Sequence, residues 1–242
     1  MDWHGFLDRR PQAYLGRGRP DRRVLALTFD DGPGAATPAL LDALGELEVR
    51  ASFFCVGAAM RARPQLLRRL LDAGHELGNH SERHADARGI EALSWMRDEV
   101  APAAQVLATA VGEGTTAAAT TAPLFRPAYG EIDAAQFDAL AAAGYVVVGW
   151  SVDPRDWLEP DAPGYVPCVV ESVLARIHPG AIVLLHDGDD ERGRARAGIV
   201  EIVRRLVPAL RDQGYGFVCA GELLAARAAG SEALQAEPRF TG

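Results

Sequence analysis

The feature that most constrains the fold is a repeated alternation of short apolar runs with amphipathic helical segments. The 242-residue chain alternates in this way about seven times. The expected strands are 24–29, 51–56, 75–78, 124–125, 145–152, 181–185 and 216–220. The expected helices are 37–48 (with Thr37 as N-cap), 64–73, 89–111 (with a possible break at Pro102), 133–143, 165–177, 196–213 and 221–229. Such alternation predicts an α/β fold with parallel strands and the helices outside.

The first apolar run is not followed by a glycine-rich dinucleotide-binding loop, which favours a barrel or partial barrel over an open sheet. We expect a single domain over 24–229, after an N-terminal lead-in (1–23) and before a C-terminal tail (230–242). A stretch rich in Gly, Thr and Ala, 112–123, is expected to be a loop insertion. In parallel barrels the functional groups collect at the carboxyl ends of the strands, so candidate residues should directly follow apolar runs.

The charged residues exclude several classes of function. The net charge of −8 argues against a nucleic-acid partner, because such proteins present a basic stripe. Every basic side chain except histidine is arginine, and the absence of lysine excludes Schiff-base chemistry and a phosphate-binding P-loop. An odd number of widely spaced cysteines, Cys55, Cys168 and Cys219, predicts reduced, buried thiols.

No segment of the sequence is expected to cross or enter a membrane. The first 23 residues are polar and rich in arginine, and the longest apolar stretch, 141–150, contains glycine and is too short to span a bilayer. We therefore expect a cytoplasmic protein as the sequence stands, or an extracytoplasmic one if a leader has been removed. The sequence does not indicate an oligomeric state.

Two adjacent aspartates, Asp30 and Asp31, end the first apolar run and are followed by the turn residues Gly32 and Pro33. Neighbouring carboxylates repel each other unless they share a cation or a proton. Successive strand residues point to opposite sides, so the two carboxylates need not have the same chemical role. In isolation this pattern is typical of a solvated turn, and only further partners would make it a site.

Two histidines, His80 and His84, follow the third strand at a spacing that lets both imidazoles meet one metal ion. Together with Asp31 they could form a two-histidine, one-carboxylate site, which leaves positions open for water as catalytic metals require. Three other histidines have no such potential partner ligands near them in the sequence and are expected to be structural: His4, His75 and His178.

Further polar groups follow the later strands. Arg126 could pair with a carboxylate and hold it ionised, while the rigid turn after it presents a backbone N–H to developing charge. Asp156 could orient the imidazole of His186 and raise its pKa, which would make it a competent acid near neutral pH. Trp157 either packs on a helix or covers a ligand.

The motifs TFDDGP, HSERH, RPAYG, DPRDW and LLHDG, in this order, resemble the five motifs of the polysaccharide deacetylase family. This family is also called carbohydrate esterase family 4, or the NodB-homology fold, and the resemblance spans about 24–220. It implies a distorted, incomplete (β/α) barrel of about seven parallel strands and the removal of acetyl groups from sugars. It also implies one divalent metal ion, commonly zinc, although cobalt, nickel or manganese would suit the same ligands. Ala128 departs from the family pattern, which usually has a second proline there.

The resemblance implies a role for each matched residue. The implied metal ligands are Asp31, His80 and His84. The implied catalytic residues are Asp30 as general base, Arg126 as its partner, His186 as general acid, Asp156 as the residue that tunes it, and Tyr129, whose backbone N–H would stabilise the oxyanion. The implied walls of the acetyl pocket are Trp157, Leu184 and Tyr129.

The expected reaction is metal-dependent removal of N-acetyl groups from an N-acetylglucosamine-type saccharide. Peptidoglycan, chitin oligomers, capsule and a small cytoplasmic N-acyl sugar would all fit the same core. One alternative is a deacetylase-like carbohydrate-binding protein without turnover, although that protein would be expected to lack a base, an acid or a ligand. Another is an aspartate-based phosphatase, which needs acids two residues apart and usually a lysine.

Overall fold

The computed structural model describes residues 10–112, 123–158, 162–189, 193 and 195–235, with the backbone alone for 230–235. Its strands form one curled sheet in the order β1-β6-β5-β4-β3-β2-β7, and β8 pairs with β2. The strands are β1 (Tyr14–Leu15), β2 (Val24–Asp30), β3 (Ser52–Cys55), β4 (Glu76–Asn79), β5 (Leu124–Phe125), β6 (Val146–Val148), β7 (Ile182–His186) and β8 (Gly216–Phe217). All of these strand pairs are parallel, and the sheet order ends at β1 and β7 without joining them. The expected distorted, incomplete (β/α) barrel is therefore confirmed.

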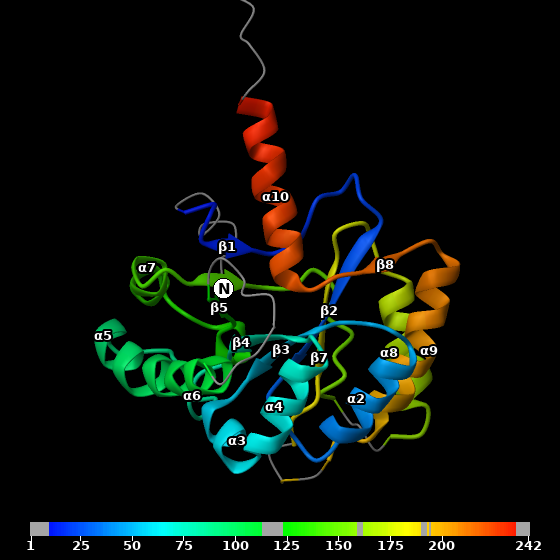
Figure 1. Ribbon diagram of the computed structural model, residues 1–242, viewed down its shortest axis with the longest axis horizontal. Helices are drawn as coiled ribbons and strands as arrows, with labels where there is room; N and C mark the ends of the chain where they lie inside the picture. Colours follow the sequence, from blue (N-terminus) through cyan, green and yellow to red (C-terminus); the bar gives the residue numbers. More distant parts are fainter. Residues whose placement is uncertain (1–9, 113–122, 159–161, 190–192, 194, 236–242) are drawn as a thin grey trace, which may run out of the picture.

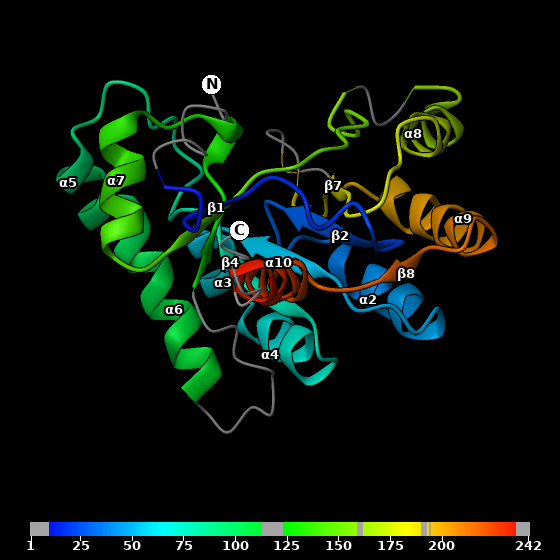
Figure 2. The same cartoon turned by 90° about the horizontal axis from the view of Figure 1, so that it is seen from above.

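Helices surround the strands on the outside of this half-barrel (Figure 2). The outer helices are α2 (Thr37–Glu46), α3 (Gly57–Ala62), α4 (Pro64–Asp72), α5 (Ala92–Trp95), α6 (Ala101–Gly112), α7 (Ala134–Ala142), α8 (Tyr165–Leu174) and α9 (Gly198–Asp212). A further helix, α10 (Ala220–Gln235), packs through Ala220 and Leu223 in one cluster with Leu15, Ala26 and Phe54 of the strands. A π-helical turn, Met96–Val100, joins α5 to α6, so the helix continues through Pro102. The far end of α10 extends away from the barrel (Figure 1). Among the described residues, no helix has the length and apolar character needed to cross a membrane.

Strand β2 separates an apolar layer from the interior of the half-barrel. Leu25, Leu27 and Phe29 pack with α2 and α9 in the largest hydrophobic cluster. Because side chains alternate along a strand, Thr28 and Asp30 point to the opposite side, into the half-barrel. The apolar residues thus anchor a strand whose polar residues face the interior.

The expected strand 145–152 is much shorter in the structure, where β6 covers only Val146–Val148. The buried side chain of Arg126 explains the early end, because it donates to the carbonyl oxygens of Val148 and Gly149 at 3.1 and 2.9 Å. These carbonyl groups are used by a side chain instead of a neighbouring strand. The chain pairs with β7 again at a bridge between Val152 and Val183.

Three other details differ from expectation. Ala36, and not Thr37, is the N-cap of α2, because the Thr37 hydroxyl accepts the Gly34 N–H and donates to Asp187. Cys168 is exposed on α8, whereas the other two cysteines are buried as expected. Strand β1, which pairs with β6, lies in a segment where no strand was predicted. The expected loop insertion lies, for residues 113–122, outside the described residues.

Candidate active site

Two turns at the carboxyl ends of the neighbouring strands β2 and β7 interlock. The N–H groups of Asp187 and Gly188 donate to the carbonyl of Asp30 at 3.1 and 3.3 Å. A Cβ on Gly32 would lie 2.3 Å from an Asp187 carboxylate oxygen, and one on Gly188 would lie 2.3 Å from the Asp31 Cβ. Each Asp-Gly pair therefore needs its glycine so that the aspartate of the other turn can approach closely.

Asp31, His80 and His84 meet at this end of the sheet. Asp31 Oδ1 lies 3.4 Å from His80 Nε2 and 3.3 Å from His84 Nε2, and one ligand atom from each residue lies within 4.8 Å of the others. His80 Nδ1 lies 2.7 Å from the Arg126 carbonyl oxygen. That oxygen can only accept, so Nδ1 carries a proton and the neutral ring keeps its Nε2 lone pair facing Asp31.

The chemistry of this donor set fits a divalent metal ion. Asp31 Oδ1 is buried and has no hydrogen-bond partner among the described residues, as a carboxylate oxygen reserved for a metal would be. Mainly burial lowers the pKa of His84 to about 4, so this imidazole is neutral at pH 7. A metal ligand requires the neutral form.

Asp30 is bound by a fully buried arginine. Arg126 NH1 lies 2.7 Å from Asp30 Oδ1 and also donates to Thr28 Oγ1 at 2.8 Å. The guanidinium additionally lies over the ring of Phe54, 4.1 Å from its centroid. Removing one partner of such a buried pair typically costs about 3–5 kcal/mol, because the other charge is left uncompensated. The remaining oxygen, Asp30 Oδ2, lies 3.7 Å from His80 Nε2 and thus beside the candidate metal ligands.

His186 is oriented by the buried carboxylate of Asp156. Its Nδ1 lies 2.7 Å from Asp156 Oδ1, and its backbone N–H donates to Oδ2 at 2.8 Å. Burial alone would lower the pKa of His186, but the charge and hydrogen bond of Asp156 outweigh it and raise the pKa to about 9. The Tyr165 hydroxyl donates to the Asp156 carbonyl at 2.5 Å and supports this loop. His186 pairs in register with Asp30 across β2 and β7.

Of the three expected pocket residues, Tyr129 contacts His84, and the other two are close along the chain to Asp156 or His186. Tyr129 has a left-handed φ of 56° and an exposed side chain, with its ring centroid 4.5 Å from that of His84. Trp157 directly follows Asp156 and is half exposed. Leu184 is buried two residues before His186, so both lie on the same face of β7.

Two residues of the site had no expected role. Asp187 is buried, and mainly this burial raises its pKa to about 7. In the sequence, only its position directly after His186 could have indicated that Asp187 belongs to the site. Arg196 is also buried, with NH2 3.7 Å from Asp31 Oδ2. It is one of three arginines within 192–196, and the sequence does not distinguish it from the other two.

Comparisons with known proteins agree with this geometry. Residues 17–148 match the family model described as polysaccharide deacetylase. The chain is 38% identical over 207 residues to a chitooligosaccharide deacetylase of Sinorhizobium fredii, covering 83% of this chain and 90% of that protein. It is 35% identical over 218 residues to a peptidoglycan-N-acetylglucosamine deacetylase of Bacillus cereus, covering 88% and 94%.

A solved structure shares the fold over nearly the whole length. The crystal structure of a peptidoglycan N-acetylglucosamine deacetylase superposes with a TM-score of 0.78 at 27% identity, covering 90% of this chain and 95% of that one. The sequence motifs, the half-barrel and these matches agree, and the chain belongs to the polysaccharide deacetylase family.

Proposed function

We propose that the protein is a metal-dependent hydrolase that removes N-acetyl groups from an N-acetylglucosamine-type saccharide. One observation carries the proposal. Asp30, bound by Arg126, and His186, bound by Asp156, are paired at the ends of the neighbouring strands β2 and β7. Beside them lies the ligand set of one aspartate and two histidines. Amide hydrolysis needs these three parts, namely a base, an acid and an electrophilic centre. The deacetylases among the relatives support the same reaction class.

Asp31, His80 and His84 would hold the metal ion, and we propose zinc, with cobalt, nickel or manganese as alternatives. When bound, such an ion supplies an activated water and polarises the acetyl carbonyl. The chain prepares this site by fixing the His80 tautomer through the Arg126 carbonyl and by burying Asp31 Oδ1.

Asp30 is the proposed general base. Its Oδ1 is engaged by Arg126, so Oδ2, which lies on the side of His80, is the oxygen that takes the proton of the attacking water. The buried guanidinium pairs directly with Asp30 Oδ1 and so compensates the charge of the carboxylate. The adjacent aspartates thus divide the work, since Asp31 binds the metal and Asp30 moves the proton.

His186 is the proposed general acid. Asp156 occupies its Nδ1, so the proton on Nε2 is the one available to the leaving nitrogen. An amine leaves readily only when it is protonated, and an acid of this kind typically contributes about 10²–10⁴-fold in rate. We assign the Tyr129 backbone N–H to the developing oxyanion, and Trp157 and Leu184 to the walls of the acetyl pocket.

The test is release of free amine from N-acetylglucosamine oligomers by the wild type and by Asp30→Asn. We expect Asp30→Asn to lose at least about 10²-fold in kcat, as loss of a general base does, while elemental analysis still finds one metal ion per chain. Asp42→Asn is the matched control, because Asp42 forms an exposed ion pair with Arg69. A wild type that releases no amine would disprove the function, and a fully active Asp30→Asn would disprove the assigned base.

A further inference from the structure

The segment that carries both candidate histidine ligands, 80–84, has a strained backbone, and we call it the ligand loop. Ser81 and His84 have left-handed φ angles of 66° and 56°, which residues other than glycine rarely adopt. Such conformations cost free energy and persist only where the surrounding structure enforces them. Contacts with other parts of the chain are therefore needed to hold His84 beside Asp31.

Asn79 and Ser81 provide part of these contacts. The side-chain oxygen of Asn79 accepts the Ser81 N–H at 2.8 Å, and Ser81 Oγ accepts the His84 N–H at 3.1 Å. The side-chain nitrogen of Asn79 in turn donates to the Val100 carbonyl oxygen at 2.9 Å. The ligand loop is thus connected to the π-helical turn Met96–Val100 that precedes α6.

A second residue of this π-helical turn, Glu99, binds the ligand loop directly. Its Oε2 accepts the backbone N–H of Arg83 at 3.0 Å, and its Oε1 forms an ion pair with the Arg83 guanidinium. The side chain of Glu99 is only 3% exposed, whereas that of Arg83 is 63% exposed. Burying a carboxylate is costly unless it is paired, so its contact with Arg83 accounts for its presence here. Arg83 directly precedes the candidate ligand His84.

The widened turn brings Glu99 and Val100 to the ligand loop together. Pro102 has no N–H, and in a regular α-helix its ring would clash with the carbonyl group four residues earlier. The helix widens immediately before this proline, where the Ala101 N–H bonds to the Met96 carbonyl oxygen, five residues back. In this turn Glu99 and Val100 are both buried, and both bind the ligand loop or the residue before it.

We propose that Glu99 is a positioning residue for the metal-binding set, because its carboxylate holds the Arg83 N–H and thereby fixes the orientation of His84. Glu99 acts through Arg83 and not on the metal ion itself. Residues that orient metal ligands from outside typically account for about 10–100-fold in metal affinity. This inference rests on the proposed function, because it takes Asp31, His80 and His84 as the metal ligands.

The test compares the wild type with Glu99→Met, which keeps a side chain of similar length and removes both acceptor oxygens. The deciding readout is the zinc dissociation constant, measured by competition with a chelator. Hydrogen exchange of the 80–84 amides in the metal-free protein and the midpoint of urea unfolding are measured in parallel. We expect Glu99→Met to bind zinc about 10–100-fold more weakly and to exchange these amides faster. A role in general stability alone would lower the urea midpoint and leave the dissociation constant of the folded protein unchanged.

Two further variants separate the contact with Arg83 from other effects. Glu99→Gln keeps an oxygen that can accept the Arg83 N–H, so its zinc affinity should stay within about threefold of the wild-type value. Asp98→Asn is the matched control from the same turn, because Asp98 forms an exposed ion pair with Arg97, and it should change neither affinity nor exchange. If Glu99→Met does not fold, Glu99→Leu is measured instead.

The inference is overturned if Glu99→Met retains the zinc affinity of the wild type. It is also overturned if Glu99→Gln or Asp98→Asn loses as much affinity as Glu99→Met. A wild type that binds no divalent metal ion, or that releases no amine from N-acetylglucosamine oligomers, shows that the proposed function has failed. A wild type that does both, together with an unchanged zinc affinity in Glu99→Met, shows that only this inference has failed.

Discussion

Strand β4 has a buried histidine at each end, and the two ends of the strand differ in how their polar atoms are satisfied. His75 precedes the strand and is packed edge-on against Phe53, and its Nδ1 accepts the Ala51 N–H at 3.2 Å. Burial, and after it the charge of Arg50, lower the pKa of His75 to about 4. His80 follows the strand, and although burial alone would lower its pKa, the charges of Asp30 and Asp31 raise it. The same residue type, equally buried, is therefore neutral at one end and placed among carboxylates at the other.

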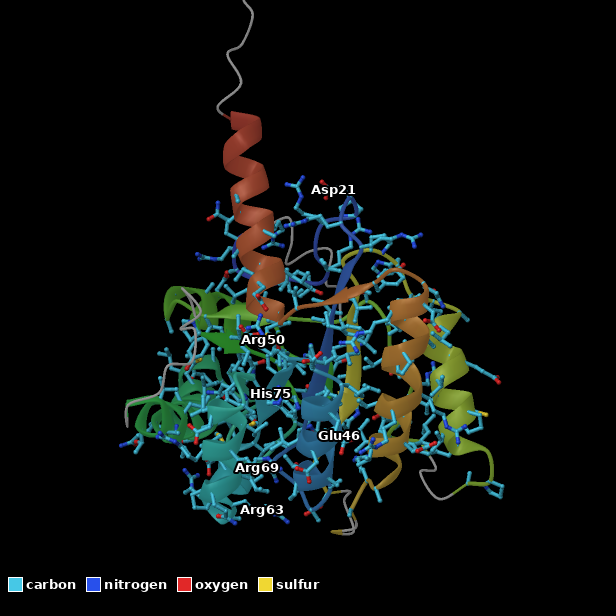
Figure 3. The ribbon with its side chains drawn as sticks, turned by 45° about the vertical axis from the view of Figure 1, so that its right-hand side comes forward. Asp21, Glu46, Arg50, Arg63, Arg69 and His75 are labelled. Atoms are coloured by element: carbon cyan, nitrogen blue, oxygen red, sulfur yellow. The ribbon has the colours of Figure 1, made fainter. Side chains whose placement is uncertain are left out.

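The surroundings of the two histidines repeat this contrast. At the amino end, Ser52 Oγ donates to Glu76 Oε2 at 2.7 Å and accepts the Ala220 N–H at 2.8 Å. At the carboxyl end lie most of the buried side-chain atoms that lack a hydrogen-bond partner among the described residues. They belong to Asp31, Glu82, Asp187 and Arg196. Figure 3 lets the reader locate the two ends of the strands. Asp21, just before β2, marks the amino end, and Arg63, which binds the Pro33 carbonyl after β2, marks the carboxyl end. Burial is therefore common to both ends of β4, whereas most of the buried polar atoms without a partner gather at one of them.

The largest expected effect comes from exchanging the two histidines of β4 for alanine one at a time. His80→Ala should lose the metal ion and at least about 10³-fold in kcat, because a ligand is removed from a three-residue set. His75→Ala should keep metal and kcat but lose about 1–3 kcal/mol in the free energy of unfolding, because the Ala51 N–H loses its acceptor. Elemental analysis, amine release and urea denaturation measure these quantities. Loss of metal in His75→Ala would refute the contrast between the two ends.

An intermediate effect is expected from Asp156→Asn. Asp156 raises the pKa of His186 to about 9, so the acid form of His186 persists at neutral pH and is lost as the pH rises through that value. Without the negative charge this pKa falls, and the alkaline limb of the kcat/KM profile should move to lower pH by at least about one unit. Asp72→Asn, which removes half of an exposed ion pair on α4, should leave the profile unchanged. An unshifted limb in Asp156→Asn would show that another group sets it.

The smallest expected effect concerns the glycines. Gly188→Ala would push a Cβ against Asp31, so we expect a loss of about 1–3 kcal/mol in stability and a clear weakening of metal binding. Gly45→Ala, in α2 with no atom within 4 Å of the new Cβ, should instead stabilise the protein by about 0.5–1 kcal/mol. Thermal unfolding and chelator competition give both values. Equal metal affinity in Gly188→Ala and the wild type would show that the turns need not interlock.

The positions of several site residues follow from local sequence rules. Asp31, His80 and His84 each follow an apolar run, and because parallel strands end at one edge of the sheet, these side chains could be expected to meet. The structure brings them together. The half-barrel followed in the same way from the alternation of strands and helices.

Other features depend on contacts between distant residues and could not be read from local patterns. The sequence 145–152 has the composition of a long strand, yet β6 ends at Val148, where the Arg126 side chain binds the carbonyl oxygens of Val148 and Gly149. Thr37 has the sequence signature of an N-cap, but its hydroxyl is taken by Gly34 and Asp187. The burial of Arg196 depends on its approach to Asp31, which lies far away in the sequence.

Arg126 contributes to the site through two chemically independent parts. Its guanidinium binds Asp30, whereas its backbone carbonyl oxygen accepts the hydrogen bond donated by His80 Nδ1–H. Every amino acid has that carbonyl, so a substitution at this position removes the partner of the proposed base and spares the acceptor that orients the proposed metal ligand His80. In the proposed mechanism, proton transfer and metal orientation are therefore separable at a single codon: a substitution of Arg126 removes the side chain that binds Asp30 and leaves the hydrogen-bond acceptor of His80 in place.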